Sequence, residues 1–188
     1  GTGNDETGFG TQDSPLATIQ KGIDMSDDGH TILVTSGLYV ENINYNGKSI
    51  SIIGEDRETT IIDGSQSQLA SVVTISGADD TTTVLDGFTI RNGSSFAAGG
   101  GIYCYESIPT LKNLKIENNM VEQDGGGIYS YNSFIRSSNI LIANNSASTG
   151  GAIALYYSDA NLEHLTMIGN AADEFGGGIY SDNSNLNI

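Results

Sequence analysis

Several residue types that commonly stabilise or charge a small protein are scarce in this chain. It contains one cysteine, Cys104, which excludes an internal disulfide and any cysteine-rich metal site. Tryptophan is absent and proline occurs only twice. No apolar run reaches the roughly 18 residues that a membrane-spanning helix needs. The chain is therefore not a disulfide scaffold, and we expect no transmembrane segment.

Positive charge is scarce as well. Lysine and arginine total 7 residues against 23 aspartates and glutamates, which gives a net charge of −16. Nucleic acids and anionic membrane surfaces are bound through Lys and Arg, so we expect neither as a partner. Glycine, in contrast, supplies 25 of the 188 residues, well above the roughly 7 % of average proteins. The length fits a single domain over residues 1–188.

The second half of the chain is built from a repeat of 25 or 26 residues. One string, GGGIY or GGAIA, occurs at Gly99–Tyr103, Gly125–Tyr129, Gly150–Ala154 and Gly176–Tyr180. A second string keeps the same period at Leu114–Asn119, Ile140–Asn145 and Leu165–Asn170. Within each string, apolar residues alternate with polar ones, which is the pattern of a β-strand. The sequence therefore predicts stacked β coils, because a helical solenoid needs longer segments rich in Ala and Leu.

This pattern predicts an all-β fold, a right-handed parallel β-helix with three strands per coil of about 25 residues. Equivalent residues should stack about 4.8 Å apart, one coil above the next. We expect three interior apolar ladders, formed by Ile102, Ile128, Ile153 and Ile179; by Leu114, Ile140 and Leu165; and by Ile116, Ile142 and Met167. We also expect Asn119, Asn145 and Asn170 to hydrogen-bond along the axis at a turn.

The first half is less regular. Residues 1–30 are expected to form an N-terminal segment with a capping helix from Ser14 to Met25, because Ser14 and Pro15 fit the start of a helix. Residues 31–93 then form irregular coils, and residues 94–188 form the regular ones. Strands are expected at Thr31–Val34, Tyr39–Ile43, Ser49–Ile53, Thr60–Ile62, Val72–Ile75 and Val84–Ile90. The chain stops part-way into a coil, so we expect further coils or another chain at this uncapped C-terminal edge.

Two stretches carry a resemblance to known proteins. GNDETGFGTQDSPLATIQKGID at the start, followed by DGHTILVTSGLYVENI, resembles the opening of secreted pectate-lyase-like β-helix proteins. The GGAI string and the recurring I-x-x-N, as at Ile116 and Asn119, are similar to repeats of chlamydial polymorphic outer-membrane proteins, in which Phe precedes the x-x-N. The resemblance implies a β-helix that is secreted or at the cell surface. It leaves activity open, since this superfamily includes lyases, glycoside hydrolases and adhesins.

Strand parity places a set of tyrosines on one outer face. If Ile102 points inward, Tyr103 points outward, Cys104 inward and Tyr105 outward. The outward set comprises Tyr103, Tyr105, Tyr129, Tyr131, Tyr156 and Tyr180. Aromatic faces contact sugar rings, and tyrosine hydroxyls donate hydrogen bonds to them. The alternatives are tyrosines that stack for stability alone, tyrosines buried under a loop, and a protein interface.

Acidic residues in the turns form a second candidate site. Asp124 and Glu174 precede glycine triplets, and Asp173 adds a third carboxylate. Clustered carboxylates bind Ca²⁺, which prefers six to eight oxygen ligands. The alternative is a set of solvated acidic turns, because the spacing matches no calcium-loop motif. No cofactor other than this possible Ca²⁺ is expected.

Three functions fit these observations. The first is a secreted or cell-surface module, adhesin-like, that binds polysaccharide or a partner along the tyrosines. The second is the N-terminal part of a carbohydrate-active enzyme, either a polysaccharide lyase or a glycoside hydrolase. The third is a structural or assembly unit without a ligand. Basic residues are few and no pair of carboxylates stands out, so catalytic residues cannot be named and the binding module is favoured over an enzyme.

Overall fold

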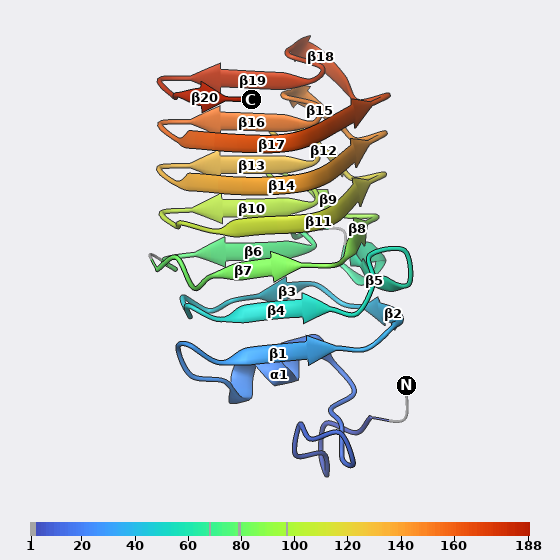
Figure 1. Cartoon of the computed structure of the whole chain (residues 1–188). Helices are drawn as coiled ribbons and strands as arrows, with labels where there is room; N and C mark the ends of the chain where they lie inside the picture. Colours follow the sequence, from blue (N-terminus) through green and yellow to red (C-terminus); the bar gives the residue numbers. More distant parts are fainter. Residues whose placement is uncertain (1–2, 68, 79, 97) are drawn as a thin grey trace.

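The chain forms a column of parallel coils that is closed at one end by a short helix (Figure 1). The computed structural model describes residues 3–67, 69–78, 80–96 and 98–188. Every pairing between the named strands is parallel, with each strand bonded to its equivalents in the coils below and above. This arrangement is a right-handed parallel β-helix, as predicted.

Six coils follow one another along the axis. The first two contain β1 (Thr31–Val34), β2 (Gly37–Val40), β3 (Ile43–Asn44), β4 (Ser51–Gly54), β5 (Thr60–Asp63), the 3₁₀ turn η1 (Gly64–Gln66) and β6 (Val73–Ser76). The next two contain β7 (Val84–Asp86), β8 (Thr89–Arg91), β9 (Ser94–Ser95), β10 (Ile102–Tyr105), β11 (Thr110–Glu117), β12 (Met120–Val121) and β13 (Ile128–Tyr131). The last two contain β14 (Phe134–Ala143), β15 (Ser146–Thr149), β16 (Ile153–Tyr156), β17 (Asp159–Ile168), β18 (Ala171–Phe175) and β19 (Ile179–Asp182), and β20 (Leu186–Asn187) follows.

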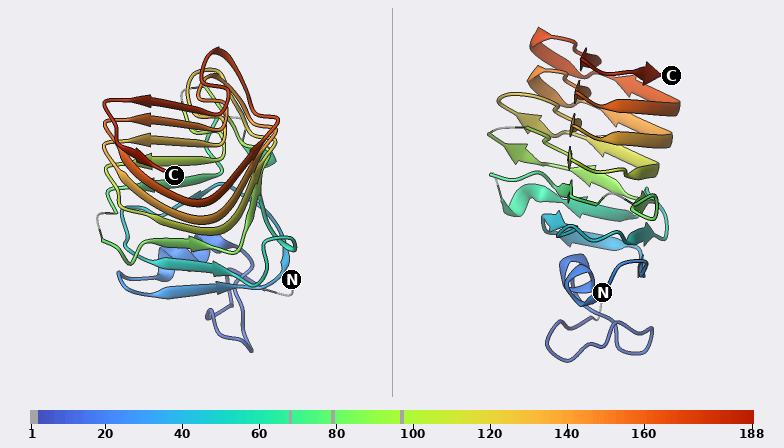
Figure 2. Two further views of the ribbon diagram at one scale, coloured as in Figure 1. Left: turned by 45° about the horizontal axis from the view of Figure 1, so that its top comes forward. Right: turned by 90° about the vertical axis from the view of Figure 1, so that its left-hand side faces the viewer.

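The strands make three sheets that are stacked along the column axis, and the third begins only at β9 (Figure 2). The first has the order β1-β4-β7-β11-β14-β17-β20 and is joined by β2, β5 and β8. The second has the order β3-β6-β10-β13-β16-β19, and the third β9-β12-β15-β18. Because equivalent strands stack in register, one side chain type can repeat up a whole face. The second sheet carries the tyrosines.

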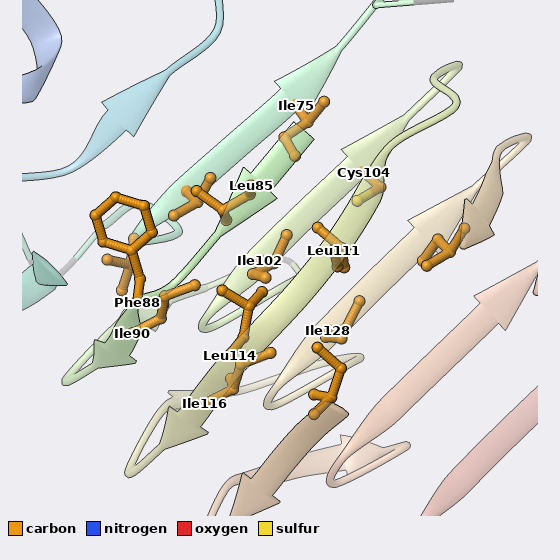
Figure 3. Packing of buried hydrophobic residues seen from close by; sticks show 14 of the residues in the cluster. Ile75, Leu85, Phe88, Ile90, Ile102, Cys104, Leu111, Leu114, Ile116 and Ile128 are labelled. Atoms are coloured by element: carbon orange, nitrogen blue, oxygen red, sulfur yellow. The ribbon is translucent and has the colours of Figure 1, made fainter. Parts of the chain in front are cut away.

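The interior ladders form as predicted in all but the last coil. Register pairs Ile102 with Ile128, Ile128 with Ile153 and Ile153 with Ile179. Leu111, Leu114 and Ile116 of β11 point into the same core (Figure 3). Burial of each such side chain contributes about 1.5–3 kcal/mol. Met167 is a correction, because it is 38 % exposed: it belongs to the last full coil, where the described chain places only the short β20 above its strand.

The asparagine ladder is also confirmed. The side-chain oxygen Oδ1 of Asn145 accepts a hydrogen bond from the backbone N–H of Asn119 at 3.0 Å. It accepts a second one from the Asn119 side-chain amide at 2.9 Å. Oδ1 of Asn170 accepts the same two hydrogen bonds from Asn145, from its backbone N–H at 3.0 Å and from its side-chain amide at 2.9 Å. The residues before them, Asn118 and Asn144, have φ of 55°, which asparagine tolerates better than most residues. The ladder satisfies buried turn groups without water.

The capping helix is shorter than predicted. Helix α1 spans Ile19–Met25 and is capped by the Thr18 hydroxyl, which accepts from the backbone N–H of Lys21. Ser14 is not the cap, because its carbonyl accepts from Phe9 and from Thr11 within a turn. The helix does cover the lower end of the column, as expected (Figure 1). Its residues Ile19 and Ile23 are buried in the core.

Two predicted strands are each divided in two. The expected strand Val84–Ile90 is β7 and β8, which are separated at Gly87 with φ of 82°. In later coils the same bend lies inside one long strand, at Asn113, Asn139 and His164, with φ of 47°, 57° and 52°. The expected strand Tyr39–Ile43 likewise appears as the end of β2 and the start of β3.

Candidate functional site

The second sheet presents two adjacent columns of tyrosines to the outside, which we call the tyrosine face. Register stacks Tyr103, Tyr129, Ala154 and Tyr180 in the first column. It stacks Tyr105, Tyr131, Tyr156 and Asp182 in the second. The residues between them, such as Ile102 and Cys104, are fully buried. Inward apolar residues alternate with outward aromatic residues along each strand, and equivalent strands stack in register. The tyrosines therefore lie on one outer face, as the alternation in the sequence predicts.

A glycine before each strand allows the tyrosines to pack closely. Gly125 has φ of 71°, and a Cβ atom added to it would lie 2.8 Å from the Cβ of Tyr129. A Cβ atom added to Gly99 would likewise lie 2.9 Å from the Cβ of Tyr103. Such contacts are shorter than real Cβ atoms show, so any other residue there would push the backbone away from the ring.

The rings stack on one another along the column. Tyr103 and Tyr129 have centroids 5.4 Å apart and planes that differ by 9°. Tyr105 and Tyr131 are 5.6 Å apart with planes 7° apart. Offset stacking of this kind contributes about 0.5–1.5 kcal/mol per pair beyond area burial. The stacking that the structural alternative requires is therefore present, and in these pairs the facing sides of the rings cover one another.

The first column lacks one ring, and a neighbour fills the space. Ala154 stands where a tyrosine would continue the stack, and it is fully buried. Tyr156 leans over it, with centroids 5.7 Å from Tyr129 and 5.5 Å from Tyr180. Tyr157 then packs edge-on against Tyr131, at 5.7 Å and 67°. Tyr157 is the site residue that strand parity missed, because its φ of 50° belongs to a turn and not to a strand.

Close packing changes the acidity of these phenols. Burial raises the pKa of Tyr129 to about 12, and the nearby Tyr103 and Asp124 reinforce the shift. Burial also raises the pKa of Tyr156, to which the charge of Asp124 adds. Tyr129 and Tyr156 therefore stay neutral hydrogen-bonding groups at physiological pH.

A turn of repeated geometry borders the second tyrosine column. Glu106, Asn132, Tyr157 and Asn183 occupy equivalent positions, with φ of 46°, 48°, 50° and 49°. The residues that follow form a serine ladder, in which Ser133 Oγ accepts from the backbone N–H of Ser107 at 3.1 Å and Ser158 Oγ from that of Ser133 at 3.1 Å. The ladder continues one coil further, where Ser184 Oγ accepts from the backbone N–H of Ser158 at 2.9 Å. The recurrence of serine every 25 or 26 residues was the sequence signal for it.

An open groove runs along this turn, and we call it the corner groove. Its volume is about 590 Å³. It is lined by Gly77, Glu106, Ser107, Ile108, Asn132, Ser133, Phe134, Tyr157, Asp159 and Asn183. A second hollow of about 400 Å³ adjoins it and is lined by Tyr105, Glu106, Tyr131, Asn132 and Tyr157. The Arg136 guanidinium lies 4.3 Å from the Phe134 ring centre and packs over it. The groove thus combines aromatic rings, amides and carboxylates from successive coils.

The predicted calcium ligands do not gather into a cluster. Asp124 pairs with Ala98 below and Thr149 above, and Thr149 pairs with Phe175, so Glu174 is offset by one residue from Asp124's column. Asp173 and Glu174 lie on β18, two coils above Asp124. Over residues 3–67, 69–78, 80–96 and 98–188, no group of three or more His, Cys, Asp or Glu side chains is placed to hold a metal ion. The calcium site stays a prediction without geometric support.

Comparison with known proteins adds little to this picture. No protein-family model and no curated protein matches the chain. Among solved structures, one match is the deglycosylated crystal structure of the pectin methylesterase from Aspergillus niger, at 15 % identity and a TM-score of 0.29. The match covers 94 % of this chain and 84 % of that chain. A likeness this low carries no argument, so the β-helix assignment rests on strand pairing. The similarity to chlamydial repeats stays a resemblance. In the described part of the chain, no helix is long and apolar enough to cross a membrane.

Proposed function

We propose that the protein is a polysaccharide-binding module that holds its ligand in the corner groove, against Tyr157 and the edge of the tyrosine face. The observation that carries this proposal is the exposure of Tyr157, which is 56 % accessible although it belongs to the aromatic cluster. Most rings of the tyrosine face are partly covered by their neighbours. The ring of Tyr157 instead lines the groove, and its plane is turned by 67° from that of the Tyr131 ring. An exposed ring beside hydrogen-bonding amides is the common chemistry of sugar recognition.

The polar lining fits the hydroxyl groups of a sugar chain. Asn132 and Asn183 occupy equivalent turns two coils apart, and Glu106 precedes them in the same column. Amides and carboxylates arranged along one axis offer donors and acceptors to successive units of a linear polymer. Tyr105 and Tyr131 add their ring edges and hydroxyls next to the groove.

Charge selects among polysaccharides. The protein has a net charge of −16, and Glu106 and Asp159 both line the groove. A polyanionic chain would be repelled, so the ligand is a neutral or cationic polysaccharide. Many neutral polysaccharides occur outside cells, which fits a secreted or cell-surface location for the protein.

A glycan array followed by calorimetric titration tests the proposal. Tyr157→Ala should weaken binding of the best neutral or cationic glycan about tenfold, roughly 1.4 kcal/mol. Phe9→Ala is the matched control, since Phe9 is 77 % exposed and lies in the N-terminal segment. Unchanged affinity in Tyr157→Ala, or equal losses in both variants, would remove the groove from consideration.

A glycoside hydrolase is the second candidate, because two carboxylates, Glu106 and Asp159, line the same groove. Glycosidases act through such a pair. The glycan that binds most tightly should then be incubated with the protein and new reducing ends measured. Release that disappears in Glu106→Gln would favour the enzyme, and binding without release would favour the module.

A further inference from the structure

The stacked pair Tyr105 and Tyr131 has a geometry suited to covalent coupling. The two residues are register partners on neighbouring parallel strands, β10 and β13. Their rings are nearly parallel, with 7° between planes and 5.6 Å between centroids. In two parallel rings attached in the same way, the carbons beside each hydroxyl also face one another at about the same separation. Coupling then requires rotations of both side chains about their Cα–Cβ and Cβ–Cγ bonds, which bring those carbons to bonding distance.

We infer that Tyr105 and Tyr131 form an oxidative cross-linking site, at which a peroxidase with hydrogen peroxide joins the two phenols as dityrosine. This inference is independent of glycan binding. Each phenol loses one electron and its hydroxyl proton, and the two radicals form a carbon–carbon bond between the ring positions next to the oxygens. The two ring hydrogens at that bond then return to the oxygens. In total the pair gives up two electrons and two protons, which reduce one hydrogen peroxide to two waters.

Access and proton removal favour this pair over the others. Tyr105 is 36 % exposed and lies in the second column, at the hollow beside the corner groove. The charge of the Glu106 carboxylate raises the pKa of Tyr105, so this carboxylate lies near enough to accept the proton that oxidation releases. Tyr103 and Tyr129, in the first column, are both more covered than Tyr105. The planes of the Tyr131 and Tyr157 rings meet at 67°, so these two rings are not stacked face to face.

The cross-link would tie one coil to the next. The bond closes a loop from residue 105 to residue 131, which is one full coil of the helix. Such a closure restricts the unfolded chain in the way a disulfide does. The chain has no second cysteine with which to make a disulfide, and Cys104 is fully buried. The cross-linked protein should therefore melt at a higher temperature than the untreated protein.

Tryptic cleavage makes the cross-link easy to locate. Cleavage after Arg91, Lys112, Lys115 and Arg136 places Tyr103 and Tyr105 in peptide 92–112, and Tyr129 and Tyr131 in peptide 116–136. The tyrosines of the two upper coils fall in peptide 137–188. The dilute protein should be treated with peroxidase and hydrogen peroxide, then digested and examined for dityrosine fluorescence and mass. We expect monomeric protein that has lost two hydrogens, and a joined pair of peptides 92–112 and 116–136.

Phenylalanine variants separate the two columns without removing the rings. Tyr105→Phe and Tyr131→Phe should each abolish the joined pair, while Tyr103→Phe and the distant Tyr39→Phe should leave it unchanged. The inference is overturned if the joined pair persists in Tyr105→Phe or if 116–136 is joined to 137–188 instead. It is equally overturned if only dimers form, with a yield that rises with concentration, or if no dityrosine appears.

Discussion

At the residue scale, single polar side chains fasten one coil to its neighbours. The Asn145 amide accepts two hydrogen bonds from Asn119 and donates to Asn170 at 2.9 Å and to the Ile116 carbonyl at 3.0 Å. It is 1 % exposed, so water cannot replace a lost partner. Four bonds across three coils make this side chain a structural equivalent of several backbone bonds.

Asn145→Ala should therefore destabilise the protein by about 3 kcal/mol, because the backbone groups of Asn119 and Ile116 lose a buried partner. Asn161→Ala is the control, since Asn161 is exposed on β17, and it should change stability by less than about 0.5 kcal/mol. Urea denaturation of both variants measures the difference. Similar midpoints for the two variants would contradict the ladder's role.

A second prediction at this scale concerns pH. The folded pKa of Tyr129 is raised to about 12 by burial, against about 10 in an unfolded chain. Between these values the unfolded state has released the proton that the folded state keeps, so stability must fall as pH rises through this window. The urea midpoint should drop between about pH 10 and pH 12, and the drop should be smaller in Tyr129→Phe. An identical slope in both proteins would show that Tyr129 does not contribute.

The tyrosine face also shows what residue patterns predict and what they miss. Alternation around Ile102 and Ile128 was enough to place the outward tyrosines, because a strand has a fixed period of two. It gave no information on Ala154, whose missing ring draws Tyr156 sideways. It also missed Tyr157, because the left-handed turn conformation of that residue ends the alternation. Ring packing depends on neighbours one coil away, which no local pattern records.

At the element scale, the end of the column depends on how helix α1 is attached. The Glu41 carboxylate accepts from the first backbone N–H groups of the helix, at Ile19 and Gln20, both at 2.9 Å. Asp5 binds the residues before it, Ala17 and Thr18. The sequence predicted a helix here from the spacing of its apolar residues, but not its start. Its first turn is fixed by acids that are 12 to 22 residues away in the chain.

Glu41 supplies the prediction at this scale. Its pKa is raised, chiefly because burial disfavours the charge. Glu41→Gln removes that buried charge but keeps an acceptor oxygen for only one of the two N–H groups, so it should cost less than the Ala variant, by about 1 kcal/mol. Glu41→Ala leaves both N–H groups without their acceptor and should cost about 1–3 kcal/mol. Glu58→Ala, at an exposed acid, is the control. Equal effects of the Gln and Ala variants on thermal unfolding would show that the carboxylate does not anchor the helix.

At the scale of the whole molecule, the repeat joins structure to proposed function. Each regular coil contributes the same parts: an inward isoleucine, an outward aromatic position, a left-handed residue and a ladder serine. Stacking these parts produces a continuous face and a groove that no single coil contains. The repeat of 25 or 26 residues is visible in the sequence, and it was sufficient to predict the β-helix fold. The groove could not be predicted from the sequence, because it arises where four turns from successive coils adjoin.

The central claim is that the corner groove, and not another surface, holds the polysaccharide. Its most direct test is an NMR titration of the isotope-labelled protein with the glycan that binds best on the array. We predict that backbone amide shifts change around Glu106, Asn132 and Tyr157, in three successive coils, and that Leu33 and Leu38 on the outer side of the first coil stay unchanged. Shifts centred on the first coil, or spread evenly over the surface, would contradict the claim.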